Sequence, residues 1–122
     1  MKALLILAHG SPRPEANEDV VKVAEEVRGR NAFPLVEVGY LDCNEPDIPT
    51  AIETCVALGA TTIVAVPYFL HSGKHFLLDV PELLDAAATR HPSVTILLGD
   101  YLGHEPQLVD VLMDRAQDMI AQ

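Results

Sequence analysis

Four short apolar runs alternate along the chain with four segments in which apolar residues recur at helical spacing. Each run is continuous rather than strictly alternating, which is typical of strands whose two faces are both covered by helices. The runs predict strands at residues 3–8, 35–41, 61–67 and 93–98. Because parallel strands need crossovers of about a dozen residues or more, which the helical segments supply, the pattern favours a three-layer α/β sandwich around a four-stranded parallel sheet.

Proline, glycine and acidic residues mark the expected helix boundaries. Pro14 and Gly29 bracket the first helical segment, and Asp47 is a candidate N-cap for the second. Asp79, followed three residues later by Glu82, resembles a capping box. The third helix is therefore expected to begin at about Asp79.

The last helical segment has the clearest periodicity and is expected to open at Pro106. Its apolar residues form one stripe, which consists of Leu108, Val109, Leu112, Met113, Ala116, Met119 and Ile120. Aspartate and arginine occupy other positions of the segment. A stripe of this kind predicts a helix that faces the core.

The chain has 122 residues, of which 49% are hydrophobic, so we expect one α/β domain spanning residues 1–122. No apolar run approaches the roughly 18 residues that a membrane span requires, and no signal-peptide pattern follows Met1. We therefore expect a soluble, cytoplasmic protein. Cys43 and Cys55 lack a CxxC spacing, which argues against a disulfide framework, and Cys55 is expected in the core.

Acidic residues dominate the charge. Eight Lys and Arg face 18 Asp and Glu, giving a formal net charge of −10. This excess argues against nucleic acid or an anionic membrane as a partner. An anionic small molecule would have to be met by local donors, such as Arg13, Lys74 or backbone N–H groups at helix starts.

Histidine-bearing turns follow two of the predicted strands. His9 comes directly after the first strand, and His75 lies in the turn after the third. The turn after the second strand adds Asp42 and Glu45, which are candidates for an acid or base. Ligands of open parallel sheets bind outside the carboxyl ends of the strands, and imidazoles suit Fe, Co, Ni or Zn, so the pattern favours a transition-metal site. The alternative is that these side chains are bonded to backbone or solvated.

His71 and His75 would form a metal-binding pair at helical spacing only if the third helix began early. Ser72 and Gly73 are poor residues for starting a helix, so we expect His71 to lie outside the first coordination sphere of a metal.

The chain resembles the small CbiX/SirB-type sirohydrochlorin chelatases, class II chelatases that insert a divalent metal into a tetrapyrrole. The matching blocks occur in order along nearly the whole chain, at His9-Gly10-Ser11, residues 40–48, residues 67–75, residues 79–83, and Leu102-Gly103 with Pro106. The resemblance implies a flavodoxin-like class II chelatase fold and lyase activity in cobalamin, siroheme or related biosynthesis. Co²⁺, Fe²⁺ or Ni²⁺ would be a substrate, with no permanently bound cofactor.

The resemblance also implies residue roles. His9 and His75 would bind the metal, and a carboxylate of the second turn would assist. The family usually has glutamate where Asp42 stands, so Glu45 is a substitute for this role. The residues implied to bind the tetrapyrrole are Ser11, Arg13, Tyr68, Phe69, Leu70, Ser72, Gly73 and Lys74. A chain of one unit resembles the short form of the family, which pairs as a homodimer.

The sequence departs from the family pattern at two positions, and two alternatives to the chelatase function remain open. Glu105 separates His104 from Pro106, whereas the family has histidine directly before the proline, so no role is carried over to His104. The Asp42 departure favours a non-catalytic metal-binding or tetrapyrrole-binding module of the same fold. An unrelated hydrolase or phosphatase that uses His9 is the other alternative. The sequence contains no GxGxxG, GxxxxGK[ST] or nucleophile-elbow motif, which counts against it.

Overall fold

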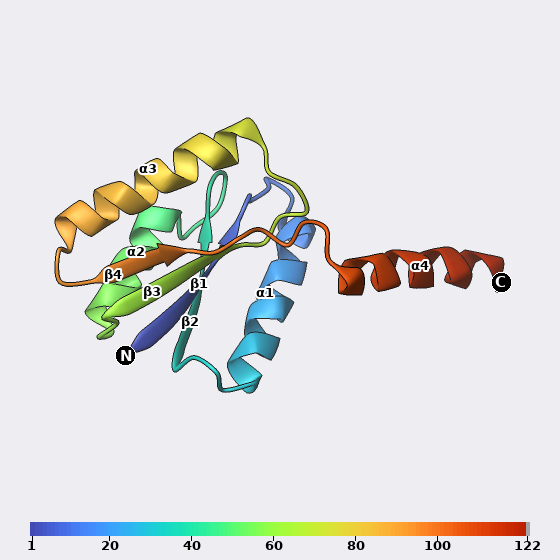
Figure 1. Cartoon of the computed structure of the whole chain (residues 1–122), viewed down its shortest axis with the longest axis horizontal. Helices are drawn as coiled ribbons and strands as arrows, with labels where there is room; N and C mark the ends of the chain where they lie inside the picture. The colour runs from blue at the N-terminus through green and yellow to red at the C-terminus, as the bar shows by residue number, and fades with distance from the viewer. Residues whose placement is uncertain (122) are drawn as a thin grey trace.

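The structure is a computed structural model that describes residues 1–121, apart from the side chains of Lys74, His75 and Leu77. Strands and helices alternate along the described chain (Figure 1). They are β1 (Lys2–Ala8), α1 (Pro14–Gly29), β2 (Leu35–Tyr40), α2 (Ile48–Ala57), β3 (Thr62–Pro67), α3 (Lys74–Arg90), β4 (Thr95–Leu98) and α4 (Pro106–Ile120). The predicted strand positions are confirmed to within two residues at each end.

The four strands form one parallel sheet in the order β2-β1-β3-β4. Successive residues of β1 point to opposite faces, so Leu5 packs with α2 and α3 whereas Ile6 packs with α1. Figure 1 shows the same layering, with α1 on one side of the sheet and α2 and α3 on the other. The predicted three-layer α/β sandwich is therefore confirmed.

The first two helices begin where their local signals predict. α1 extends from Pro14 to Gly29. At the start of α2, Asp47 is the N-cap, and its carboxylate accepts a hydrogen bond from the Thr50 N–H at 2.9 Å. This bond satisfies one of the helix donors that have no intrahelical partner. It also lowers the pKa of Asp47 from its usual value.

The prediction for the third helix is wrong at its start. α3 begins at Lys74, with Gly73 as an extended N-cap, and not at Asp79. The pair Asp79 and Glu82 therefore lies inside the helix and is no capping box. Pro81 also lies inside the helix, although proline usually interrupts one.

Packing explains the early start of α3. Phe76, Val80 and Leu84 recur every four residues along the helix, and all three are buried. The ring of Phe76 meets the ring of Phe69 edge-on, with the ring centres 4.9 Å apart. Burial of this continuous apolar face extends the helix ahead of the local cap signal, because tertiary packing outweighs local preference.

The prediction that the last helix faces the core is also wrong. Helix α4 opens at Pro106 as expected, but none of its residues is buried. Leu112 and Ile120 of the apolar stripe are 66% and 77% exposed. Figure 1 shows α4 projecting away from the sheet and the other helices. The pattern correctly identified an apolar face, but it does not show whether the core of this chain covers that face.

The positions of the two cysteines agree with the prediction made from the sequence. Cys43 is exposed, Cys55 is buried, and both thiols are free. Burial raises the pKa of the Cys55 thiol to about 11, with a further contribution from the charge of Glu37. Cys55 is therefore a core residue, as predicted. No helix in the described part of the chain combines the length and apolar character that crossing a membrane requires.

Candidate functional site

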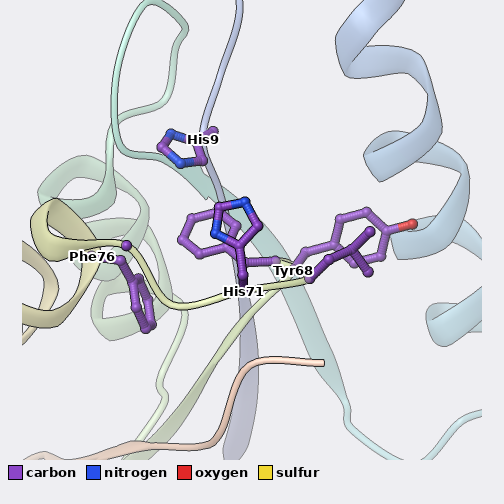
Figure 2. A pocket seen from close by; sticks show the side chains of 7 residues that line it. His9, Tyr68, His71 and Phe76 are labelled. Atoms are coloured by element: carbon purple, nitrogen blue, oxygen red, sulfur yellow. The ribbon is translucent and has the colours of Figure 1, made fainter. Parts of the chain in front are cut away.

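A pocket opens where β1 and β3 end, at the carboxyl edge of the sheet. Its volume is about 400 Å³, which is within the usual range for ligand sites. The described residues that line it are His9, Tyr68, Phe69, Leu70, His71, Gly73 and Phe76. Figure 2 shows that the two imidazoles reach this pocket from the separate turns that follow β1 and β3.

A buried aromatic pair supports the imidazole of His9. The ring centres of His9 and Phe69 are 4.6 Å apart, with a tilt of 34° between the planes. Phe69 in turn contacts Phe76, and both phenylalanines are buried whereas His9 is exposed. The imidazole therefore stands on an anchored apolar platform and remains accessible to a ligand.

The turn that carries His9 packs closely against the turn after β2. The backbone N–H of Asp42 donates a hydrogen bond to the carbonyl of His9 at 3.0 Å. Gly10 has a φ of +88°, and a Cβ added there would lie 1.8 Å from the carbonyl oxygen of Asp42. Only glycine fits this contact without displacement of the backbone.

Side chains fix the same turn from two sides. The backbone N–H of Ser11 donates to Oδ1 of Asn44 at 2.7 Å, and Nδ2 of Asn17 donates to the Ser11 carbonyl at 3.1 Å. Only the carboxylates of the second turn were predicted as functional groups, so this role of Asn44 was not predicted. The sequence does place Asn44 in a turn at the ligand-binding edge of the predicted sheet, and this position is the one indication of a functional role that the sequence offers.

The carboxylates of the second turn lie beside the His9 turn and outside the set of described residues that line the pocket. Asp42 is exposed, and its Oδ1 accepts a hydrogen bond from the Cys43 N–H at 2.9 Å. Glu45 is also exposed. Asp42 is thus tied to His9 through the backbone, while both carboxylates remain accessible to solvent.

Six of the eight residues predicted to bind the tetrapyrrole fall into two groups. Tyr68, Phe69, Leu70 and Gly73 line the pocket, and Tyr68 and Leu70 are 38% and 66% exposed. Ser11 and Arg13 lie outside that lining set. The hydroxyl of Ser11 accepts a hydrogen bond from the Arg13 N–H, and the Arg13 guanidinium forms an ion pair with Glu15.

The remaining predicted residues lie where the β3 turn joins α3. Ser72 directly precedes Gly73, which lines the pocket. The side chains of Lys74 and His75 lie outside the described residues, so the predicted contacts of these two side chains stay predictions. Their backbone forms the first turn of α3, directly after Gly73.

The structure brings His71 to the pocket beside His9. As predicted, His71 lies outside α3, because that helix begins at Lys74. Among the side chains that the structure describes, no three of the His, Cys, Asp and Glu residues cluster as a metal site. Among the described residues that line the pocket, the side chains suited to bind a transition metal are therefore the imidazoles of His9 and His71.

Comparison with known proteins identifies the family. The family model for CbiX matches residues 3–119. The chain belongs to the CbiX family. It is 34% identical to the sirohydrochlorin cobaltochelatase of Methanocaldococcus jannaschii, with 95% of this chain and 98% of that protein aligned. It is 36% identical to the corresponding protein of Sulfolobus acidocaldarius, over 99% and 94% of the two chains.

A solved structure supports the same conclusion for the fold. The sirohydrochlorin chelatase SirB of Bacillus subtilis subspecies spizizenii, in complex with cobalt, has a TM-score of 0.90 and 33% identity. The alignment covers 96% of this chain and 50% of SirB. The present CbiX chain therefore corresponds to a single unit, and the chelatase-like fold implied by the sequence is confirmed.

Proposed function

We propose that this CbiX protein is a sirohydrochlorin chelatase, a lyase that inserts Co²⁺, Fe²⁺ or Ni²⁺ into sirohydrochlorin. The observation that carries the proposal is the accessible imidazole of His9 on a buried aromatic platform, at the edge of the sheet where ligands bind. The relatives include proteins named sirohydrochlorin cobaltochelatase and sirohydrochlorin ferrochelatase, and these names support sirohydrochlorin as the substrate.

In this proposal, His9 and His75 hold the incoming metal ion. Neutral imidazole is a good ligand for first-row transition metals. The start of α3, whose backbone carries His75, lies directly after Gly73, a residue that lines the pocket, and this neighbourhood supports the assignment of His75 as the second ligand. His71 lines the same pocket and is available to receive or release the ion.

The reaction itself is an exchange of protons for metal. Two pyrrole N–H bonds break, two protons leave, and the metal dication binds the ring nitrogens, so the charge of the complex is unchanged. A nearby carboxylate assists by accepting protons. Asp42 is the first candidate because its backbone is hydrogen-bonded to His9, and Glu45 in the same exposed turn is the second.

The pocket wall suits a large, partly apolar ring that carries carboxylates. Tyr68, Phe69 and Leu70 offer an apolar surface on which a tetrapyrrole face can pack. The substrate carboxylates would be met by polar groups around the rim, because the acidic chain offers no general attraction to an anion. We assign this role to Ser11, Arg13, Ser72, Gly73 and Lys74.

We further propose that residues 1–122 act as one chelatase domain, in the cytoplasm, and as a symmetric homodimer. The alignment of nearly the full chain with single-unit relatives supports the first point. The exposed apolar stripe of α4 supports pairing, since such stripes are uncommon on monomers.

An anaerobic insertion assay tests the function. Protein, sirohydrochlorin in excess, and Co²⁺, Fe²⁺ or Ni²⁺ are mixed, and the visible spectrum is followed. Insertion that is faster than the protein-free control and continues over many turnovers is expected. Stoichiometric binding without turnover would instead support a non-catalytic binding module, which the departure at Asp42 favours. Insertion rates equal to those of the protein-free control for every metal would refute the proposed chelatase activity.

A further inference from the structure

We propose that His71 is a ligand of the incoming metal ion, which it binds together with His9 before the tetrapyrrole arrives. The proposed function assigns insertion to His9 and His75 and leaves His71 without a defined step. The later step, in which the ion moves on toward the ring, rests on the proposed function. Binding of the ion by His9 and His71 does not, because it needs no tetrapyrrole.

The structure brings these two imidazoles to one pocket from distant parts of the chain. His9 follows β1, and His71 lies in the turn after β3, 62 positions further along (71 − 9). Both side chains are exposed, and Figure 2 shows both rings at the same pocket. The parallel pairing of β1 with β3 explains this, since Leu7 is opposite Pro67 and both turns leave the sheet at the same edge.

Hydrogen bonds hold the turn of His71 beside the end of β1. The backbone N–H of Tyr68 donates to the carbonyl of Leu7 at 2.8 Å. The carbonyl of Phe69 accepts a hydrogen bond from the N–H of Leu102 at 3.0 Å, which fixes the turn from the side of β4. His71 lies two residues after this anchor, so its imidazole stays close to the pocket that Phe69 also lines.

The chemistry of the described lining favours the two imidazoles as ligands. The other described residues of the lining contribute aromatic rings, one aliphatic side chain and a glycine, and they are Tyr68, Phe69, Leu70, Gly73 and Phe76. A cation that loses water in such surroundings must gain other donors, and neutral imidazole is a good ligand for first-row transition metals. Within this described lining, only His9 and His71 supply side-chain nitrogen atoms.

The two ligands differ in how firmly their rings are held. The ring of His9 stacks on Phe69 with the ring centres 4.6 Å apart, and the carbonyl of His9 accepts a hydrogen bond from the N–H of Asp42. The ring of His71 is exposed and takes part in none of the ring contacts found among the described side chains. An ion bound by both imidazoles can therefore leave His71 first, while His9 keeps it in the pocket.

This difference sets the order of ligand exchange in the proposed reaction. The bond between the metal and His71 breaks, and a bond between the metal and His75 forms in its place. Both imidazoles are neutral before and after the exchange, so no proton moves and the charge of the ion is unchanged. His71 thus loads the ion, and His9 remains bound to it throughout.

Binding of Co²⁺ alone tests the assignment without the tetrapyrrole. The metal-free full chain is titrated with Co²⁺, and binding is followed by calorimetry and by the visible absorption of the bound ion. We expect His71→Ala and His9→Ala each to weaken binding at least about tenfold, because each removes one ligand. The control is His104→Ala, which removes an exposed imidazole outside the described lining of the pocket and should bind Co²⁺ like wild type.

Two further substitutions distinguish a metal ligand from a residue of the pocket wall. His71→Phe keeps an aromatic ring but has no nitrogen donor, so it should bind Co²⁺ as weakly as His71→Ala. His71→Cys restores a metal-binding group, because cysteine thiolate is also a metal ligand, and should bind more tightly than His71→Phe. Wild-type affinity in His71→Ala or His71→Phe, equal affinity in His71→Cys and His71→Phe, or an equal loss in His104→Ala would overturn the proposal.

Insertion kinetics distinguish loading of the ion from the later steps. His71→Ala should raise KM for Co²⁺ at least about tenfold and lower kcat much less, because His9 and His75 still hold the ion when the metal is saturating. Initial rates at a series of Co²⁺ concentrations measure both constants. A lowered kcat with an unchanged KM would overturn the loading role.

Circular dichroism checks that each variant is folded, and His71→Gln replaces His71→Ala if the latter is not. The binding titration separates the failure of this inference from the failure of the proposed function. A protein that binds Co²⁺ through His71 but inserts no metal refutes the proposed function alone. An active chelatase whose His71→Ala variant binds Co²⁺ as tightly as wild type refutes only this inference.

Discussion

Oδ1 of Asn44 accepts a hydrogen bond from the backbone N–H of Ser11 at 2.7 Å, and this bond joins two turns that are 33 residues apart. The backbone bond from Asp42 to His9 lies beside it. Together these bonds fix the turn that presents His9 to the pocket. The position of the imidazole therefore depends on the turn after β2 as well as on β1.

Asn44→Ala should impair the site more than the fold. Loss of the Asn44 acceptor frees the His9 turn, and a displacement of about 1 Å at a reacting group lowers a rate by up to roughly a hundredfold. We expect kcat for metal insertion to fall at least about tenfold, with a loss of stability of about 1 kcal/mol. Steady-state kinetics and urea unfolding measure the two effects.

Thr89→Ala is the control for this substitution. It removes a side-chain hydrogen bond, from Thr89 to the carbonyl of Asp85, on the exposed surface of α3. Activity of Thr89→Ala should equal that of the wild type. Equal activity of Asn44→Ala and wild type would show that the bond to Ser11 does not position the site.

Gly10→Ala should disrupt the contact between the two turns. The added methyl would meet the Asp42 carbonyl at 1.8 Å, and the φ of +88° is unfavourable for alanine. We expect insertion activity to be lost and the free energy of unfolding to fall by at least about 2 kcal/mol. Gly29→Ala, where a Cβ meets no atom within 4 Å, should be neutral or stabilising. A fully active Gly10→Ala protein would contradict the geometry of the turn.

Phe69→Leu tests the aromatic platform. Leucine preserves an apolar side chain in the buried position but removes the ring contacts with His9 and Phe76. We expect a stability loss of about 1.5 kcal/mol and a larger proportional loss in insertion rate. Phe33→Leu, a partly buried ring in the core beside α1, is the matched control and should affect stability alone. A rate loss of the same size in both variants would indicate a general effect of packing.

The cap of α2 should contribute stability in a defined pH range. Hydrogen bonding to Thr50 lowers the pKa of Asp47 from its usual value. Because the folded-state pKa is depressed, the contribution is fully present above the unfolded-state pKa and is lost as the pH falls through the folded-state value. Asp47→Ala should therefore lower Tm at about pH 7, and the difference from wild type should shrink at about pH 3.

Asp47→Asn separates the two components of this effect. Asparagine also accepts the bond from the Thr50 N–H, so Tm at neutral pH should stay closer to wild type than in Asp47→Ala. Thermal unfolding of the three proteins measures the comparison. A Tm difference between Asp47→Ala and wild type that is independent of pH would contradict a role for the carboxylate charge.

The sequence predicted elements whose signals are local. Pro14 marks the start of α1, and Asp47 caps α2 as its spacing indicates. The start of α3 was mispredicted because it depends on burial of Phe76 against Phe69, a contact between separate segments. The placement of α4 was mispredicted for a related reason, since the spacing of its apolar stripe does not say whether the stripe packs on the core, and in the structure its residues are exposed.

The candidate site was also predicted only where its signals are local in the sequence. The end of a buried strand placed His9 correctly on the ligand edge, and the apolar wall of Phe69 and its neighbours was expected there. His71 was not assigned to the pocket, because its sequence spacing was considered only relative to His75. The role of Asn44 depends on a hydrogen bond between distant turns, which no local pattern reveals.

The initial rate of anaerobic Co²⁺ insertion into sirohydrochlorin, measured for wild type and His9→Ala, tests the central claim most directly. Thr89→Ala serves as the control for handling and concentration. We predict catalysis by wild type and the control, and a His9→Ala rate reduced at least about a hundredfold toward that of the protein-free reaction. A His9→Ala protein that inserts the metal as fast as wild type would contradict this prediction.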